Sequence, residues 1–148
     1  MQRSKRRTQM DILVLVGRIL FALPFLAFGA NHLLKTPYMA GYAESKGLPA
    51  AKATTILSGV LLIVGGLSVL LGVWADLGLL LLLVFLIPTT LVMHAFWRES
   101  APDARQAEMT QFLKNAGLTG AALALLAFVS FAGAELGLTF TGPLFSMD

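Results

Sequence analysis

The chain has 148 residues, enough for one domain, and 57% of them are hydrophobic while only 13% carry a charge. With a mean hydropathy of +0.78, this composition exceeds what a soluble core needs and indicates a membrane protein. The net charge of +3 comes mostly from Arg3, Lys5, Arg6 and Arg7, whose place before an apolar segment suits anionic lipid better than nucleic acid. No cysteine is present, which excludes a disulfide, a thiolate nucleophile or a dithiol redox cycle within this chain.

Residues 1–11 form a basic tail, and residues 12–34 are the first segment long enough to cross a bilayer. A cleaved signal peptide is the competing interpretation, with Ala27-Phe28-Gly29 as its small-residue cleavage site. The apolar run is longer than a signal peptide needs and contains Arg18, which favours a retained helix. Two roles for Arg18 stand equal: its long stem carries the charge to the near interface, or the charge faces the bundle in a ligand or ion site.

The loop at 35–52 is expected to hold a short helix. Thr36 can cap this helix, Pro37 suits its first position, and Gly47 can end it in the left-handed conformation. Tyr42 follows a second tyrosine by four residues on the same face, and tyrosine favours the membrane–water interface. The short helix is therefore predicted to lie on the bilayer surface, as an anchor or a lid.

Two further spans are predicted at 53–74 and 77–97. In the first of these, small residues recur every seven positions, so a neighbouring backbone can come close and we expect this face inside the bundle. The residues concerned are Ser58, Gly65 and Gly72. In the second, the leucine run at 79–83 is expected to face lipid.

The last span is predicted at 112–131, after a charged loop at 98–111. Asp103 and Gln106 have the spacing of a capping box, so this helix is expected to begin on the membrane surface. One face of the span carries only small residues at every fourth position, which is typical of helix packing in membranes. These residues are Ala116, Gly120 and Ala124.

Residues 12–131 are therefore predicted to form one all-α domain, an up-down bundle of four transmembrane helices, followed by a loose interfacial tail at 132–148. Four spans place both termini on one side of the membrane. The ends of the first and third helices and the start of the fourth then meet on the other side. The candidate pocket residues gathered there are His32, His94, Trp97 and Asn115, with Arg18 as a fifth candidate inside the bundle.

The chemistry of this group admits two interpretations. Two histidines could ligate a metal or haem, but two are few and no carboxylate at helical spacing completes the set, so we expect no tightly bound metal or haem. A pocket of histidine, tryptophan and asparagine could instead hydrogen-bond and stack a flat ligand with a polar head, such as a quinone. Alternatively, these are interfacial side chains whose polar ends reach water and each other. From the residues alone, this last interpretation is the stronger one.

Several short motifs follow one another along the chain. They are Arg18, Gly29-Ala30-Asn31-His32, Tyr42-Ala43-Glu44-Ser45-Lys46-Gly47-Leu48-Pro49, Leu71-Gly72, His94-Ala95-Phe96-Trp97 and Phe112-Leu113-Lys114-Asn115. In this order and spacing, over about 17–126, they resemble the DoxX family of small bacterial inner-membrane proteins. The resemblance implies four transmembrane helices in an up-down bundle. It also implies a link to membrane redox systems, such as thiosulfate oxidation through quinone or oxidative-stress complexes.

The chain departs from this family pattern at two positions. His32 stands where the family often has a lysine, and Leu62 stands where it often has a glutamate. That glutamate would be a natural partner for Arg18, because a charge inside the bilayer needs a counter-charge or water. An ion or proton role for such a pair is therefore not carried over to this protein.

Three functions are compatible with these observations. The first is a membrane subunit or accessory of a redox system, with a membrane or peripheral partner supplying catalysis. The second is a non-catalytic module that binds a lipid or quinone, or assists the assembly of a partner. The third, a self-sufficient haem or metal enzyme, is disfavoured by the missing cysteines and the two histidines. The substrate and the oligomeric state stay open, and an oligomer is compatible with the sequence.

The positive charges on the two sides of the bundle give conflicting predictions of the membrane orientation. The basic run before the first helix favours an internal N-terminus. The opposite side carries six basic residues against four in the tail, and counting alone would reverse the protein. These six are Lys35, Lys46, Lys52, Arg98, Arg105 and Lys114. Because the charges of the tail are contiguous, we expect both termini in the cytoplasm.

Overall fold

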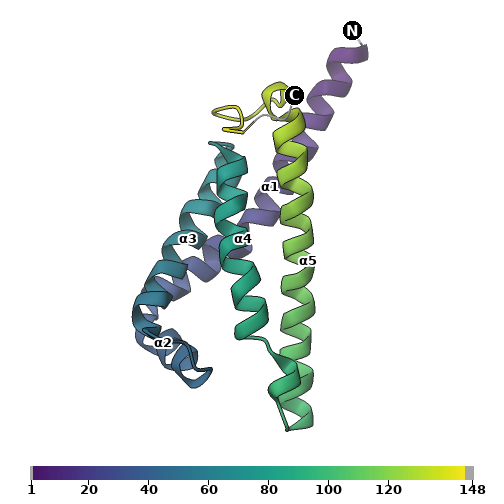
Figure 1. Ribbon diagram of the computed structural model, residues 1–148. Helices are drawn as coiled ribbons and strands as arrows, with labels where there is room; N and C mark the ends of the chain where they lie inside the picture. The colour runs from purple at the N-terminus through teal and green to yellow at the C-terminus, as the bar shows by residue number, and fades with distance from the viewer. Residues whose placement is uncertain (1, 146–148) are drawn as a thin grey trace.

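The computed structural model describes residues 2–145, and these residues form helices joined by short turns (Figure 1). Four helices are long and apolar enough to cross a membrane, as the sequence predicts. The elements are α1 (Gln2–Leu34), α2 (Thr36–Ser45), α3 (Ala51–Leu71), α4 (Ala75–Val92), α5 (Pro102–Ala132) and two short 3₁₀ helices, η1 (Phe96–Arg98) and η2 (Gly133–Glu135). The predicted all-α fold is confirmed, and both described ends of the chain lie at one end of the molecule (Figure 1).

Two helices are longer than their predicted spans. The basic residues of the tail continue α1 outward, since Lys and Arg are good helix formers and extending an existing helix is easy. The helix of the fourth span begins at Pro102, ahead of the membrane segment predicted at 112, as expected for a helix that starts on the membrane surface, so most of the charged loop is helical. The expected capping box is wrong, because Ala101 precedes the first turn and no side chain caps it. Pro102 itself starts α5, since its fixed φ suits that position.

The connections around α2 and α4 also differ from the prediction. Thr36 does not cap α2, because its hydroxyl donates back to the carbonyl oxygens of His32 and Leu33 at the end of α1. Gly47 has a φ of +82°, which gives the expected left-handed end of that helix. The third span was expected to run to 97, but α4 ends at Val92 and a turn separates it from η1.

The four long helices form an open row. α1 packs on α3, α3 packs on α4, and α4 packs on α5, while α1 and α5 have no close backbone contact. The core lies along α4 and includes Phe25 from α1, Leu62 from α3 and Ala122 from α5. The expectation that 79–83 faces lipid is wrong for most of the run, because α4 is enclosed on both sides by neighbours, and only Leu80 of the run is exposed. Leu79 and Leu82 are completely buried.

Small residues permit the close packing of α3, as predicted. A side chain at Gly65 would collide with Leu82 and the backbone of α4, and Gly72 ends the helix with a φ of +66°. Ser58, on the same face, points into a pocket described below. The small residues of α5 behave differently: an added methyl group at Gly120 would meet nothing within 4 Å. This face of α5 has no packing partner within the described chain.

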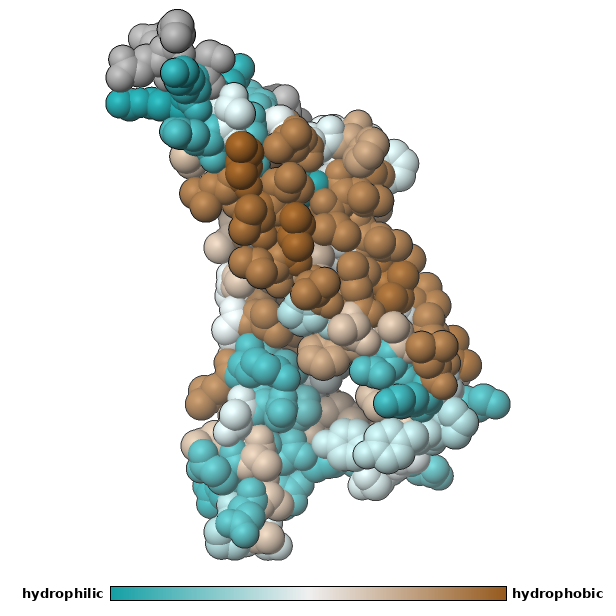
Figure 2. Space-filling model, turned by 180° about the vertical axis from the view of Figure 1, so that it is seen from behind, coloured by the Kyte–Doolittle hydropathy of each residue, from teal (hydrophilic) through white to brown (hydrophobic). Residues whose placement is uncertain are grey.

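The segment after α5 is not loose as far as residue 145. The backbone N–H of Gly137 donates to Asp11, and that of Phe145 donates to Asp76, which is completely buried in the first turn of α4. The expected tail continues to 148, and its last three residues lie outside the described part. The space-filling view shows a broad apolar band with polar surface at both ends (Figure 2). This pattern fits a protein that crosses a bilayer.

Candidate functional site

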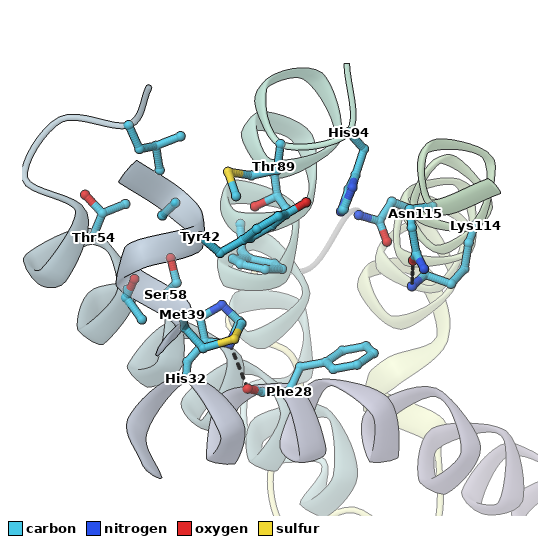
Figure 3. Close-up of a pocket in the computed structure, with 16 residues that line it drawn as sticks. Phe28, His32, Met39, Tyr42, Thr54, Ser58, Thr89, His94, Lys114 and Asn115 are labelled. Carbon is cyan, nitrogen blue, oxygen red and sulfur yellow. Dashed lines mark hydrogen bonds between the residues drawn. The ribbon is translucent and has the colours of Figure 1, made fainter. Parts of the chain in front are cut away.

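A pocket lies at the end of the bundle that carries α2, with walls from all five α-helices (Figure 3). Its cavity volume is about 240 Å³. Its apolar walls include three aromatic side chains, Phe28 of α1, Tyr42 of α2 and Phe85 of α4. In the space-filling view, the molecule is hollowed between α2 and the nearby end of α5, where apolar surface gives way to polar surface (Figure 2). The pocket therefore lies near the level of a membrane interface.

Several polar side chains of the pocket have no hydrogen-bond partner among residues 2–145. Hydroxyl groups within a helix commonly bond to the carbonyl four residues earlier, and Thr90 and Thr119 do so at 2.6 and 2.8 Å. Thr54 in the pocket lining donates to the carbonyl oxygen of Pro49 at 3.2 Å, but the other three helical Ser and Thr hydroxyls of the pocket make no backbone bond. The side chains left without a protein partner are Thr55, Ser58, Thr89 and the amide of Asn115, a residue that is itself buried. This arrangement leaves donors and acceptors available to a ligand.

The two histidines line the pocket from different sides (Figure 3). Nδ1 of His32 lies 2.8 Å from the carbonyl oxygen of Phe28, and Nδ1 of His94 lies 2.8 Å from a carboxylate oxygen of Glu108. Since a carbonyl and a carboxylate oxygen can only accept, Nδ1 carries the proton in both rings. When the ring is neutral, its Nε2 atom is an acceptor, suited to a hydroxyl group of a ligand.

The charge of the pocket lining is one-sided. Lys114 contributes a cation, and no aspartate or glutamate is among the lining residues. The ammonium of Lys114 donates to the amide oxygen of Gln111 and lies 5.4 Å from the centre of the Phe28 ring. Within the described chain it has no carboxylate partner. The lining thus favours ligands that present oxygen acceptors.

A group of polar and charged residues ties α2 to α5 at the edge of the pocket, and we call it the α2 clasp: Tyr42, Lys46, His94, Glu99 and Glu108. Glu108 is its centre, because its two carboxylate oxygens accept from Tyr42 at 3.1 Å, from Lys46 at 2.8 Å and from His94 at 2.8 Å. Lys46 also donates to Glu99 at 2.8 Å. Since α2 covers one side of the pocket, the clasp holds that cover in place.

The clasp shifts the titration of the two α2 residues. Hydrogen bonds to Glu108 and then Glu99 raise the pKa of Lys46 above its ordinary value. Burial, followed by the charge and hydrogen bond of Glu108, raises the pKa of Tyr42. Both groups therefore stay protonated at neutral pH, and the clasp is intact there.

The structure brings together three of the five candidate residues. His32, His94 and Asn115 line the pocket, but Trp97 and Arg18 are not among its lining residues. Trp97 lies half exposed in η1 and packs edge-on against the ring of Phe112, 5.7 Å away. The flat apolar wall expected from Trp97 comes instead from the aromatic residues of α1, α2 and α4. Whether the three remaining residues bind a ligand stays a prediction.

Arg18 binds backbone carbonyl groups at the end of α3 that lies away from the pocket. It is buried, and its guanidinium donates to the carbonyl oxygens of Val69, Leu70 and Leu138 at 2.8, 2.6 and 2.9 Å. The charge therefore faces the bundle, at the end of α3, and its role in a ligand or ion site stays a prediction. The last carbonyls of α3 lack helical partners and carry partial negative charge, so they replace the missing glutamate at Leu62.

Sequence reasoning missed the clasp. Glu108, Gln111 and Asn115 are spaced by three and four residues, so they share one face of α5. A helix beginning near Asp103 already makes Glu108 helical, so this spacing was a signal that the sequence offered. Lys46 and Glu99 lie far apart in sequence and could not be paired without the fold.

The described residues offer no metal centre built from this chain. Among residues 2–145, no three histidine, aspartate or glutamate side chains gather in a way that could hold a metal ion. The contact between His94 and Glu108 at the pocket uses Nδ1 and is part of the clasp. The expectation of no tightly bound haem or metal stays a prediction.

Four spanning helices and a polar pocket at one membrane surface define a small multi-pass membrane protein with a ligand-sized cavity. The chain belongs to the DoxX family, whose model matches residues 13–95, more than half of its length. It is similar to the inner membrane protein YphA of Escherichia coli (strain K12), with 27% identity over 132 residues, which cover 89% of this chain and 84% of that protein. The comparison with solved structures finds no match. The fold and the family make the chain a multi-pass protein of the bacterial inner membrane.

Proposed function

We propose that the protein is a non-catalytic membrane subunit of a redox system, and that its pocket binds the head group of a quinone or quinol. One observation carries this proposal: four polar side chains without protein partners point into a cavity with aromatic walls. A flat ring can stack against Phe85 or Tyr42. The carbonyl oxygens of a quinone can then accept from the amide of Asn115 and the ammonium of Lys114, and the hydroxyl groups of a quinol can donate to the Nε2 atoms of the histidines.

The redox part of the proposal rests on family membership. The chain carries no cysteine and the described residues form no metal cluster, so it offers few groups for electron transfer of its own. Catalysis is therefore assigned to a membrane or peripheral partner, and this chain supplies a binding place in the bilayer. A lipid head in the same pocket is the alternative occupant, and it would make the protein a binding or assembly module without a redox role.

Asn115→Ala tests the binding role without breaking the fold. The amide makes no hydrogen bond with the described residues, so its removal leaves no protein group unpaired. A lost hydrogen bond to an uncharged ligand costs about 1 kcal/mol, so we expect binding of a short-chain quinone to weaken about fivefold. His94→Ala, tested with the reduced quinol whose hydroxyl can donate to Nε2, should weaken binding similarly but also loosens the clasp. Arg105→Ala, on the exposed face of α5, is the matched control and should change neither binding nor melting temperature.

The measurement is a titration of the ligand into the protein in lipid nanodiscs, monitored by intrinsic fluorescence. Thermal melts of every variant accompany it. If Asn115→Ala binds as tightly as the unaltered protein, the amide does not contact the head group. If His94→Ala loses binding only in step with its melting temperature, His94 has a structural role alone. Binding of lipid but no quinone would favour the assembly module.

A further inference from the structure

The cavity has the size of a head group. Its volume of about 240 Å³ exceeds the roughly 150 Å³ of a cavity that is known to hold a benzene ring, so a six-membered ring with two oxygens has room in it. A long hydrocarbon tail attached to such a head does not fit beside it, and the walls decide where the tail leaves.

Three sides of the pocket are closed by packed helices. α3 packs against both α1 and α4, and α4 packs against α5, so a chain passing between these pairs would have to separate packed helices. α2 covers the end of the pocket that faces water, and it packs on α3. The clasp bonds from Tyr42 and Lys46 to Glu108 then fasten α2 to α5. A tail directed that way would also enter water, which is unfavourable for hydrocarbon.

The remaining side lies between α1 and α5. These helices have no close backbone contact, and at the level of the pocket they meet through the ammonium of Lys114 above the ring of Phe28, at 5.4 Å. Both side chains line the pocket, and the Phe28 side is 42% exposed. Figure 3 shows Phe28 on α1 and Lys114 on α5 on facing sides of the pocket. A side-chain contact can open by rotamer changes, whereas packed backbones cannot.

We propose that the pocket takes a tailed amphiphile, whose head occupies the cavity and whose hydrocarbon tail runs between Phe28 and Lys114 into the bilayer. The tail leaves through the opening between α1 and α5, which we call the lateral portal. The proposal rests on the proposed function, since it concerns the ligand of the same pocket, and it excludes tailless, water-borne ligands. Phe28 supplies an apolar surface for the first methylene groups of the tail. Lys114 stands at the polar edge, where its flexible stem keeps the ammonium near the oxygens of the head.

The absence of cysteine makes the portal directly testable. In Phe28→Cys/Lys114→Cys, a bifunctional maleimide joins the two sides of the portal, and the same variant without the linker is its reference. The matched control is Arg7→Cys/Glu135→Cys, which joins α1 to η2 at an ion pair of 3.5 Å at the other end of the molecule. The probe is a quinone with a ten-carbon tail, titrated into nanodiscs, and melting temperatures verify that each variant is folded.

Linking the portal should weaken binding of the tailed quinone at least tenfold, whereas linking the control pair should change it less than twofold. Equal binding with and without the linker across the portal overturns the lateral portal but leaves the pocket intact. No quinone binding to the unaltered protein overturns the proposed function itself.

A second measurement does not depend on the folding of a variant. A tail with a photoreactive diazirine on its first methylene groups should label peptides of α1 around Phe28 and of α5 around Lys114 in the unaltered protein. Labelling confined to α2 and α3 would contradict the portal.

Discussion

Replacing Glu108 should release α2 from α5. Glu108→Ala removes the acceptor of Tyr42 and of Lys46, the two clasp bonds that reach α2. A hydrogen bond to a charged group contributes about 1.5–3 kcal/mol. In the variant, however, Lys46 still has Glu99 as a partner, and the Lys46–Glu108 pair is partly exposed to water, so we assign about 1 kcal/mol to each lost bond. The docking of α2 should therefore weaken by about 2 kcal/mol, which is about a thirtyfold increase in its opening equilibrium.

Hydrogen–deuterium exchange in nanodiscs measures this opening directly. Amides of Thr36–Ser45 should exchange about thirtyfold faster in Glu108→Ala, while those of the α3 core stay unchanged. Glu135→Ala is the control, since Glu135 forms an exposed ion pair with Arg7 whose two side chains are 81% and 70% exposed. If α2 exchanges at the same rate in Glu108→Ala and in the control, the clasp does not hold α2 and the argument about the closed aqueous side is refuted.

Three further results are expected. The pKa values of Lys46 and Tyr42 are higher in the folded than in the unfolded chain, so their contribution to stability is full below the ordinary values of 10.5 and 10.0 and is lost as the pH rises beyond them. Hydrogen exchange of α2, corrected for the intrinsic rate, should therefore accelerate only above about pH 10. Arg18→Met leaves three carbonyls unpaired, so it should destabilise the protein by about 3 kcal/mol and expose the segment near Leu138 to protease. An unchanged melting temperature would show that these hydrogen bonds of Arg18 are dispensable. The protein purified alone should show no stoichiometric Soret band and no bound iron; a Soret band that disappears in His32→Ala or His94→Ala would reverse this expectation.

The fold could be predicted because its main determinants are local. Four apolar segments of sufficient length determine the spans, and Pro37 and Gly47 mark the ends of α2. The orientation of each helix could not be predicted equally well. Lipid and the bundle interior are both apolar, so hydropathy does not tell whether the helix face that carries Leu79 packs on protein or contacts lipid. Leu79 is buried because α4 lies inside the row, which is a property of the tertiary arrangement.

The candidate site was only partly accessible from the sequence. His32, His94 and Asn115 converge because successive spans cross the membrane in opposite directions. The ends of the first and third spans and the start of the fourth therefore lie on one side. Arg18 was ambiguous, since its partners are backbone carbonyls, which every sequence contains. The Glu108 contacts depend on the start of α5 and on a loop between α4 and η1, and neither leaves a pattern in hydropathy.

The central claim is that the pocket beside α2 binds a ligand, and filling it tests this most directly. Ser58 makes no hydrogen bond with the described residues and lines the cavity, so Ser58→Phe places a ring where the head group is expected. Titration of a short-chain quinone into nanodiscs should give saturable one-to-one binding with the unaltered protein. Ser58→Phe, with its melting temperature retained, should show only unsaturable partitioning into the lipid. Saturable binding of equal affinity in both proteins would contradict the claim, because the ligand would then occupy another place.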